Sequence, residues 1–135
     1  MGLSRLQSRL LTRAGAICYA AWGVFHVGVA HDIYALGRTQ EGLAQGRTFQ
    51  LAAYMLCIAV TAVAVAALGN WREKRWAFWF NLILIGWADG VWILVVVLPA
   101  YVPLFRGLAP PAVFALGAAL SIIGRVAGRS AAPAI

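Results

Sequence analysis

Four runs of apolar residues, each long enough to cross a lipid bilayer as a helix, divide this sequence. They cover about residues 14–33, 49–68, 76–98 and 110–127. A transmembrane helix needs about 20 predominantly apolar residues, because the hydrocarbon core is about 30 Å thick and a helix rises about 1.5 Å per residue. The runs therefore predict four transmembrane helices.

The composition excludes an ordinary water-soluble fold. Of the 135 residues, 63% are hydrophobic and 11% are charged, against roughly 45–50% and 25% in a soluble domain. The runs also lack the alternation of polar and apolar residues that outer-membrane strands show. We therefore expect an all-α, four-helix transmembrane bundle forming a single membrane domain over residues 1–135, with no room for a soluble catalytic domain.

Residues typical of helix ends flank these runs. Gly69-Asn70 follows the second run, and Pro99 and Pro103 follow the third. Pro110-Pro111 suits the first turn of the fourth helix, where a missing N–H group costs nothing. We place the start of the fourth helix there.

An amphipathic segment precedes the first run. Ser4 and Gln7 have the spacing of a capping box, in which each side chain bonds the other residue's backbone N–H. Behind them, leucines share one helical face and arginines another, at Leu3, Leu6, Leu10, Arg5, Arg9 and Arg13. We expect this segment to lie on anionic lipid headgroups.

The positions of the eleven lysines and arginines predict the orientation. Arg38, Arg47 and Arg106 fall on one side of the four runs. The other eight fall on the side of both chain ends, at Arg5, Arg9, Arg13, Arg72, Lys74, Arg75, Arg125 and Arg129. Because basic residues concentrate in cytoplasmic loops, we expect cytoplasmic N- and C-termini in a bacterial-type inner membrane. The formal charge of +7 then reflects topology, and no nucleic-acid partner is expected.

Two ionisable residues, His26 and Asp89, lie clearly inside the runs. His26 lies about 20 Å along its helix from Arg13, and Asp89 lies about 21 Å from Arg75, so both have a similar depth. If the first and third helices touch, the two side chains meet. Such a pair can hold a proton or orient a ligand. The alternative is a buried hydrogen bond that only joins two helices.

Polar residues in the second run suggest that this cluster is larger. Gln50, Tyr54, Cys57 and Thr61 share one helical face, which we expect to face the bundle interior. Tyr54 lies about 10 Å from the outer edge, so it can join His26 and Asp89 in a cluster open to the outside. A stripe used only for helix packing is the alternative.

Aromatic and small residues mark further positions in the runs. Trp22, Trp87 and Trp92 lie deeper than an interfacial belt, where they either line a pocket for a flat apolar ligand or fill the core. The pairs Gly86/Gly90 and Gly117/Ser121 have the spacing of close helix contacts.

Several kinds of chemistry lack their motifs. The sequence contains no CxxC, HExxH, GxSxG or glycine-rich phosphate loop, and we expect no metal site. His26 and His31 share one helix, which excludes a haem held between two histidines of one chain.

Two families resemble this chain in general form. Length, four spans and short loops are similar to the small multidrug resistance transporters, which use a membrane-embedded glutamate in the first helix, whereas this first helix carries His26. The segment Tyr19-Ala20-Ala21-Trp22-Gly23 resembles small four-helix bacterial proteins of the DoxX-like kind. Neither resemblance transfers a function.

Three functions are compatible with these residues. The first is a binding or accessory subunit that oligomerises or joins a membrane complex and holds a small apolar or quinone-like ligand near His26, Tyr54 and Asp89. The second is a proton-coupled transporter or channel that works as an oligomer through His26 and Asp89. The third is an enzyme acting on a lipid-soluble substrate. The absence of catalytic motifs favours the first.

Overall fold

A computed structural model describes residues 4–130, and all regular secondary structure in that range is helical. Four helices are long and apolar enough to cross a membrane. This confirms the all-α class and the prediction of four helices with the length and apolar character that crossing a membrane requires. The elements are α1 (Arg5–Gly37), α2 (Gly42–Val65) with its π-helical extension η1 (Ala66–Asn70), α3 (Arg75–Trp92) with its π-helical extension η2 (Ile93–Val97), and α4 (Leu104–Ser130).

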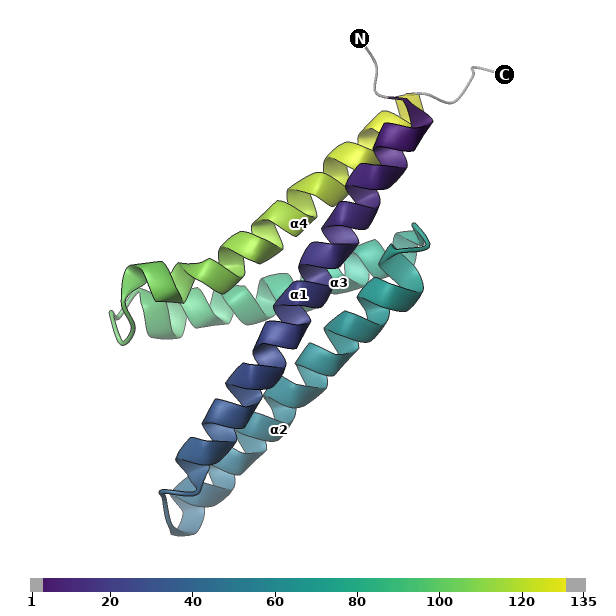
Figure 1. Ribbon diagram of the computed structural model, residues 1–135. Coiled ribbons are helices and arrows are strands. Elements are labelled where there is room, and N and C mark those ends of the chain that lie inside the picture. Colours follow the sequence, from purple (N-terminus) through teal and green to yellow (C-terminus); the bar gives the residue numbers. More distant parts are fainter. Residues whose placement is uncertain (1–3, 131–135) are drawn as a thin grey trace.

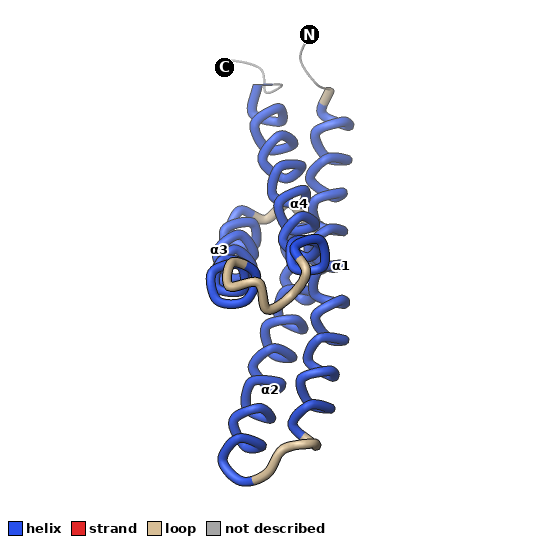
Figure 2. Tube along the Cα trace, turned by 90° about the vertical axis from the view of Figure 1, so that its left-hand side faces the viewer, coloured by secondary structure: helices blue, strands red, loops and turns tan. Residues whose placement is uncertain are grey.

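Helix α1 is the centre of the fold (Figure 1). Helix α4 runs beside its N-terminal half and α2 beside its C-terminal half. In Figure 2, α3 is seen nearly end-on while α1 and α2 run lengthwise, so α3 crosses them steeply. The four helices are therefore not a parallel bundle.

The predicted amphipathic segment is not separate from the first span, because α1 is one helix of 33 residues. The capping box is present: Gln7 N–H donates to Ser4 Oγ over 3.2 Å, and Ser4 N–H donates to Gln7 Oε1 over 2.8 Å. No proline interrupts the chain from there to Gly37, so the helix continues past both predicted limits. Leu3 lies outside the described residues.

The connection between the first two spans is also shorter than expected. Helix α1 ends at Gly37 and α2 begins at Gly42, whereas the apolar runs leave a gap from 34 to 48. Gly42 has a φ of 61°, a left-handed conformation that glycine adopts without a Cβ clash. An apolar run predicts only the segment that fits the hydrocarbon core. A helix can extend beyond that segment, because water can hydrogen-bond its last backbone groups.

The predicted start of the fourth helix at Pro110 is wrong, because α4 already begins at Leu104. Pro110 and Pro111 lie inside the helix. Lacking N–H groups, they cannot bond the carbonyl groups four residues earlier, those of Arg106 and Gly107. The Gly107 carbonyl instead accepts the indole N–H of Trp92 over 2.8 Å, which replaces the lost bond.

Small residues bring α1 close to α4. A Cβ on Gly15 would lie 2.7 Å from the Gly117 carbonyl oxygen, and a Cβ on Gly117 would lie 2.8 Å from Cys18 Cβ. Ser8 Oγ donates to the Gly124 carbonyl over 2.6 Å, and Ser121 is buried. We call this contact the α1–α4 seam. Gly117 and Ser121 thus lie in a close helix contact, as their spacing predicts.

The Gly86/Gly90 pair behaves differently. A Cβ on Gly86 would lie 3.3 Å from the ring of Phe114 in α4, so this glycine does face a neighbouring helix. No atom of another described helix lies within 4 Å of the corresponding position at Gly90. The predicted contact is therefore made at Gly86 and not at Gly90, because α3 crosses its neighbours steeply and meets them over a short length.

Candidate functional site

A cavity of about 390 Å³ lies where the four helices diverge. Its position is set by the steep crossing of α3 against the C-terminal half of α1 and the beginning of α4. All four long helices contribute to its wall. The lining residues are Trp22, Phe25, His26, Val29 and Ile33 from α1, Leu51 and Met55 from α2, Ala88, Asp89, Val91, Trp92, Val95 and Val96 from α3 and η2, and Arg106 and Pro110 from α4.

The most buried part of this wall contains a hydrogen-bonded pair. The indole Nε1–H of Trp22 donates to both carboxylate oxygens of Asp89, over 3.1 Å to Oδ1 and 3.2 Å to Oδ2. Trp22 is 1% exposed and Asp89 is 4% exposed. A buried carboxylate without a donor would be costly, so this bond fixes where α3 crosses α1.

His26 lies one helical turn beyond Trp22 and is held by it twice. Its ring stacks on the indole with centroids 3.7 Å apart, and Nδ1 lies 2.8 Å from the Trp22 carbonyl oxygen. Because a carbonyl only accepts, Nδ1 carries the proton in this bond. In a neutral imidazole, Nε2 is then an acceptor, and it has no hydrogen-bond partner among residues 4–128.

The predicted pairing of His26 with Asp89 is therefore indirect. Both side chains line one cavity, as their similar depths suggest, but no hydrogen bond joins them within the described chain. Trp22 connects them, since its indole bonds Asp89 and stacks on His26. Sequence reasoning treated Trp22 as a wall residue and did not identify it as the link.

The prediction that Gln50, Tyr54 and Cys57 face the bundle interior is wrong. All three are exposed, with Tyr54 at 58%, and none lines the cavity. Alanines take the inner face of α2 instead, since Ala59 and Ala62 are fully buried and the Ala59 carbonyl lies 2.8 Å from where a Cβ on Gly23 would be. Small residues lie on this face because they let the backbones of α1 and α2 approach each other closely.

The exposed polar residues of α2 bond one another. Arg47 Nη1 donates to Gln50 Oε1 over 3.1 Å, and Gln50 Nε2 donates to Tyr54 Oη over 2.6 Å. We call these three residues and Cys57 the α2 polar stripe. It lies on the outside of the chain, while Thr61, one turn further on, is half-buried.

The three mid-span tryptophans have different environments. Trp22 and Trp92 line the cavity, whereas Trp87 is 76% exposed and lies on the outer surface of α3. Trp92 is the last residue of α3 and is anchored to α4 through the Gly107 carbonyl. The π-helical η2 begins directly after it and supplies Val95 and Val96 to the wall; such π-helical segments are frequent at functional sites.

The sequence did not predict the positions of two polar residues, Arg106 and Asn81. Arg106 lines the cavity and is exposed, which places a cation at its edge. Asn81 is fully buried in α3, where its Nδ2 donates to the Ala62 carbonyl over 3.4 Å. An amide inside a span is as visible in the sequence as Asp89, whereas Arg106 was assigned to a loop because α4 was started too late.

The site suits a molecule that is mainly apolar and has one polar group. Its volume falls within the range of small-molecule pockets, roughly 300–1,000 Å³. His26 and Asp89 provide polar atoms at the buried end, and the exposed side chains of Phe25, Leu51 and Val95 form its outer part. Among the described residues, no group of three or more His, Cys, Asp or Glu side chains could hold a metal ion.

No family model, curated protein or solved structure matches this chain at a significant level. The chemistry of the cavity and of the molecular surface is therefore the basis for inferring a function.

Proposed function

We propose that this chain is a multi-pass protein of a bacterial-type inner membrane that binds a small, largely apolar ligand between its helices. The observation that supports this most directly is the cavity of about 390 Å³, which has aromatic and aliphatic walls and His26 and Asp89 at its buried end. A ligand with a ring and one hydroxyl or carbonyl group, such as a quinone-like molecule, has matching chemistry.

The access route supports a ligand dissolved in the membrane. Phe25, Leu51 and Val95 line the cavity and are more than half exposed. In a bilayer, exposed apolar side chains of spanning helices face lipid tails. A ligand can then enter sideways from the lipid without first crossing water.

The contacts favour binding over transport or catalysis. The α1–α4 seam is closely packed by small residues at Gly15, Gly117 and Gly124, so the contact between these two helices leaves no polar path beside the cavity. Asp89 is already bonded to Trp22, and His26 keeps one ring nitrogen for a ligand. A fixed acceptor beside a bonded carboxylate orients a ligand without requiring a reaction.

The α2 polar stripe supports the further proposal that the protein oligomerises or joins a membrane complex. Gln50 and Tyr54 bond each other but are exposed on a long apolar helix, where the second amide N–H of Gln50 and the hydroxyl O–H of Tyr54 would lack acceptors in hydrocarbon. Coverage by a second copy or by another membrane protein would remove that cost.

Native mass spectrometry of the protein purified in mild detergent tests both proposals. We expect a small molecule bound to the wild type and at least a tenfold loss of it in His26→Ala and Asp89→Asn. Two exposed neighbours on α1 provide matched controls, since His31→Ala and Asp32→Asn change the same residue types outside the cavity. Equal ligand occupancy in all five proteins, or none in the wild type, would refute the binding site.

The same spectra report the assembly. We expect the wild type to retain a second copy or a protein partner, and Tyr54→Phe with Gln50→Leu to change that stoichiometry. An unchanged monomer in both would reject association through the α2 polar stripe and leave the ligand result unaffected.

A further inference from the structure

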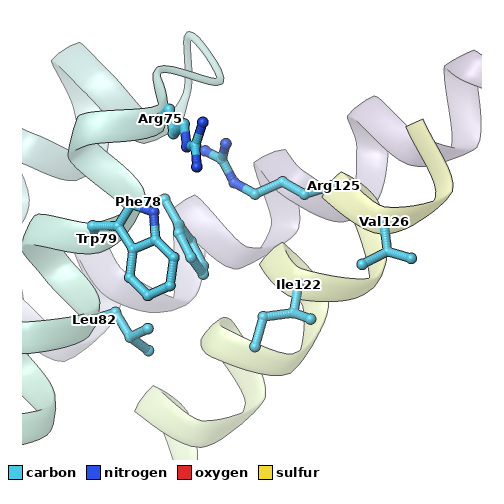
Figure 3. Close-up of a pocket in the computed structure, with 7 residues that line it drawn as sticks. All are labelled: Arg75, Phe78, Trp79, Leu82, Ile122, Arg125 and Val126. Atoms are coloured by element: carbon cyan, nitrogen blue, oxygen red, sulfur yellow. The ribbon is translucent and has the colours of Figure 1, made fainter. Parts of the chain in front are cut away.

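A second concave site lies at the other end of α3, between its first turns and the last turns of α4 (Figure 3). This groove has a volume of about 350 Å³. Arg75 and Arg125 reach over it from the two helices, and their guanidinium groups extend toward each other in Figure 3. The groove is separate from the cavity, which is lined by the opposite end of α3 and by the beginning of α4.

Contacts with Lys74 and Phe78 help to hold Arg125 in place. Its Nη2 donates to the Lys74 carbonyl over 3.2 Å, and its guanidinium lies 4.8 Å from the centre of the Phe78 ring. Arg75 has no ion pair with an acidic side chain in the described part of the chain, and the nearest carboxylate in sequence, Glu73, contacts Arg9 over 3.9 Å. Guanidinium groups from two helices that lie over one groove can both bond a single anion placed between them.

The rest of the groove is apolar. Below the guanidinium groups, Trp79 and Leu82 of α3 face Ile122 and Val126 of α4 (Figure 3). Trp79, Ile122 and Val126 are each about half exposed. A free inorganic anion would contact only the two arginines, whereas an anion attached to a hydrocarbon chain would also cover this strip.

We propose that the groove binds one anionic phospholipid, with its phosphate between Arg75 and Arg125 and an acyl chain along Trp79, Leu82 and Ile122. Guanidinium groups bond phosphate oxygens in pairs, and basic pockets between spanning helices suit lipid headgroups. This inference rests on the membrane location in the proposed function, but it does not depend on a ligand in the cavity.

Lipid retention measured by native mass spectrometry tests the site. The protein in neutral detergent is titrated with phosphatidylglycerol and, separately, with phosphatidylcholine of the same chain length. We expect selective retention of one phosphatidylglycerol, weakened about fivefold in Arg75→Gln and about 25-fold in Arg75→Gln with Arg125→Gln, because each basic side chain near an anionic headgroup contributes roughly fivefold. Arg75 is exposed, so its single variant reports binding even if Arg125→Gln disturbs the fold.

The matched control is Arg72→Gln with Lys74→Gln, which removes two exposed positive charges from the adjacent loop outside the groove. It should retain phosphatidylglycerol within about twofold of the wild type. An equal loss in the control, or equal retention of both lipids, would refute a specific groove. Displacement of the lipid by millimolar inorganic phosphate would show a free-anion site and overturn the lipid assignment. The cavity ligand should stay bound in every groove variant, so failure here is separable from failure of the proposed function.

Discussion

Trp22 is the residue on which the candidate site depends most. Its indole N–H is the donor for Asp89, its carbonyl oxygen accepts from His26, and its ring is the surface on which the imidazole stacks. One residue therefore fixes a carboxylate on a neighbouring helix and an imidazole on its own helix. Changes at Trp22 should affect both partners, while changes at either partner leave the other contact in place.

The Trp22–Asp89 bond should contribute measurably to stability. Trp22→Phe keeps an aromatic ring but removes the N–H, so a buried carboxylate loses its donor. We expect a coupling free energy of about 1–2 kcal/mol between Trp22→Phe and Asp89→Leu in a double-mutant cycle. The measurement is the free energy of unfolding in mixed detergent. Asp89→Leu should cost less, or even stabilise, once Trp22→Phe has removed the donor.

Trp87→Phe is the control for this cycle, because Trp87 belongs to the same helix as Asp89 but is 76% exposed. It should change stability by less than about 0.5 kcal/mol and show no coupling to Asp89→Leu. Additive effects of Trp22→Phe and Asp89→Leu would mean that the bond is not made in the folded protein.

At the scale of elements, two prolines in α4 create an attachment point for α3. Pro111 has no N–H to bond the Gly107 carbonyl four residues earlier, and that carbonyl accepts Trp92 Nε1. The helix loses one internal bond and gains one to its neighbour. This exchange holds Trp92 against the beginning of α4, where it lines the cavity.

This attachment predicts that Trp92→Phe and Pro111→Ala have non-additive effects on the free energy of unfolding. Trp92→Phe should cost about 1 kcal/mol in the wild type, because the Gly107 carbonyl then loses its donor. In a Pro111→Ala background the restored backbone N–H can bond that carbonyl, so the same substitution should cost about 1 kcal/mol less. Pro110→Ala is the matched control, since its N–H would face the Arg106 carbonyl instead. Unfolding in detergent measures all three, and equal costs of Trp92→Phe in every background would contradict the exchange.

The four long apolar helices could be predicted from the sequence, because a run of about 20 apolar residues has the length that a membrane-spanning helix needs. The helix ends could not, since hydropathy marks where lipid stops and not where a helix stops. That difference misplaced the start of α4 and hid Arg106 from the predicted site. Periodicity likewise identified a polar face on α2 but not whether that face points inward or outward. The inward face of α2 is the one that packs closely on α1, as at Gly23 and Ala59, and this depends on the neighbouring helix.

The part of the site that could be predicted is the part that depends only on depth along the helices. Counting residues from the span ends placed His26 and Asp89 at one depth, and both line the cavity. Depth says nothing about rotation around a helix axis, so it could not exclude Tyr54 or identify Trp22 as the link. Rotation is set by side-chain packing between helices, as at Gly15 and Gly117, and packing partners are not visible in one sequence.

In the whole molecule, the basic residues near the chain ends gather around the 71–74 loop. Arg9 contacts Glu73 over 3.9 Å, and Arg13 lies 5.2 Å from the centre of the Trp71 ring. From α4, Arg125 donates to the Lys74 carbonyl. Three segments distant in sequence therefore form one strongly basic end, which supports the proposal that this end lies in the cytoplasm.

Single-cysteine labelling tests that orientation. In a Cys18→Ser, Cys57→Ser background, we expect a membrane-impermeant maleimide to label Thr39→Cys in right-side-out vesicles and Arg72→Cys only in inverted vesicles. Both positions lie in connections between helices, so labelling reports the side and not local burial. Tyr101→Cys, in the connection before α4 and exposed, should behave like Thr39→Cys. The reverse pattern would place both chain ends outside, which would contradict the concentration of basic residues on the cytoplasmic side. Labelling of Thr39→Cys and Arg72→Cys from the same side would mean that α2 does not cross the membrane.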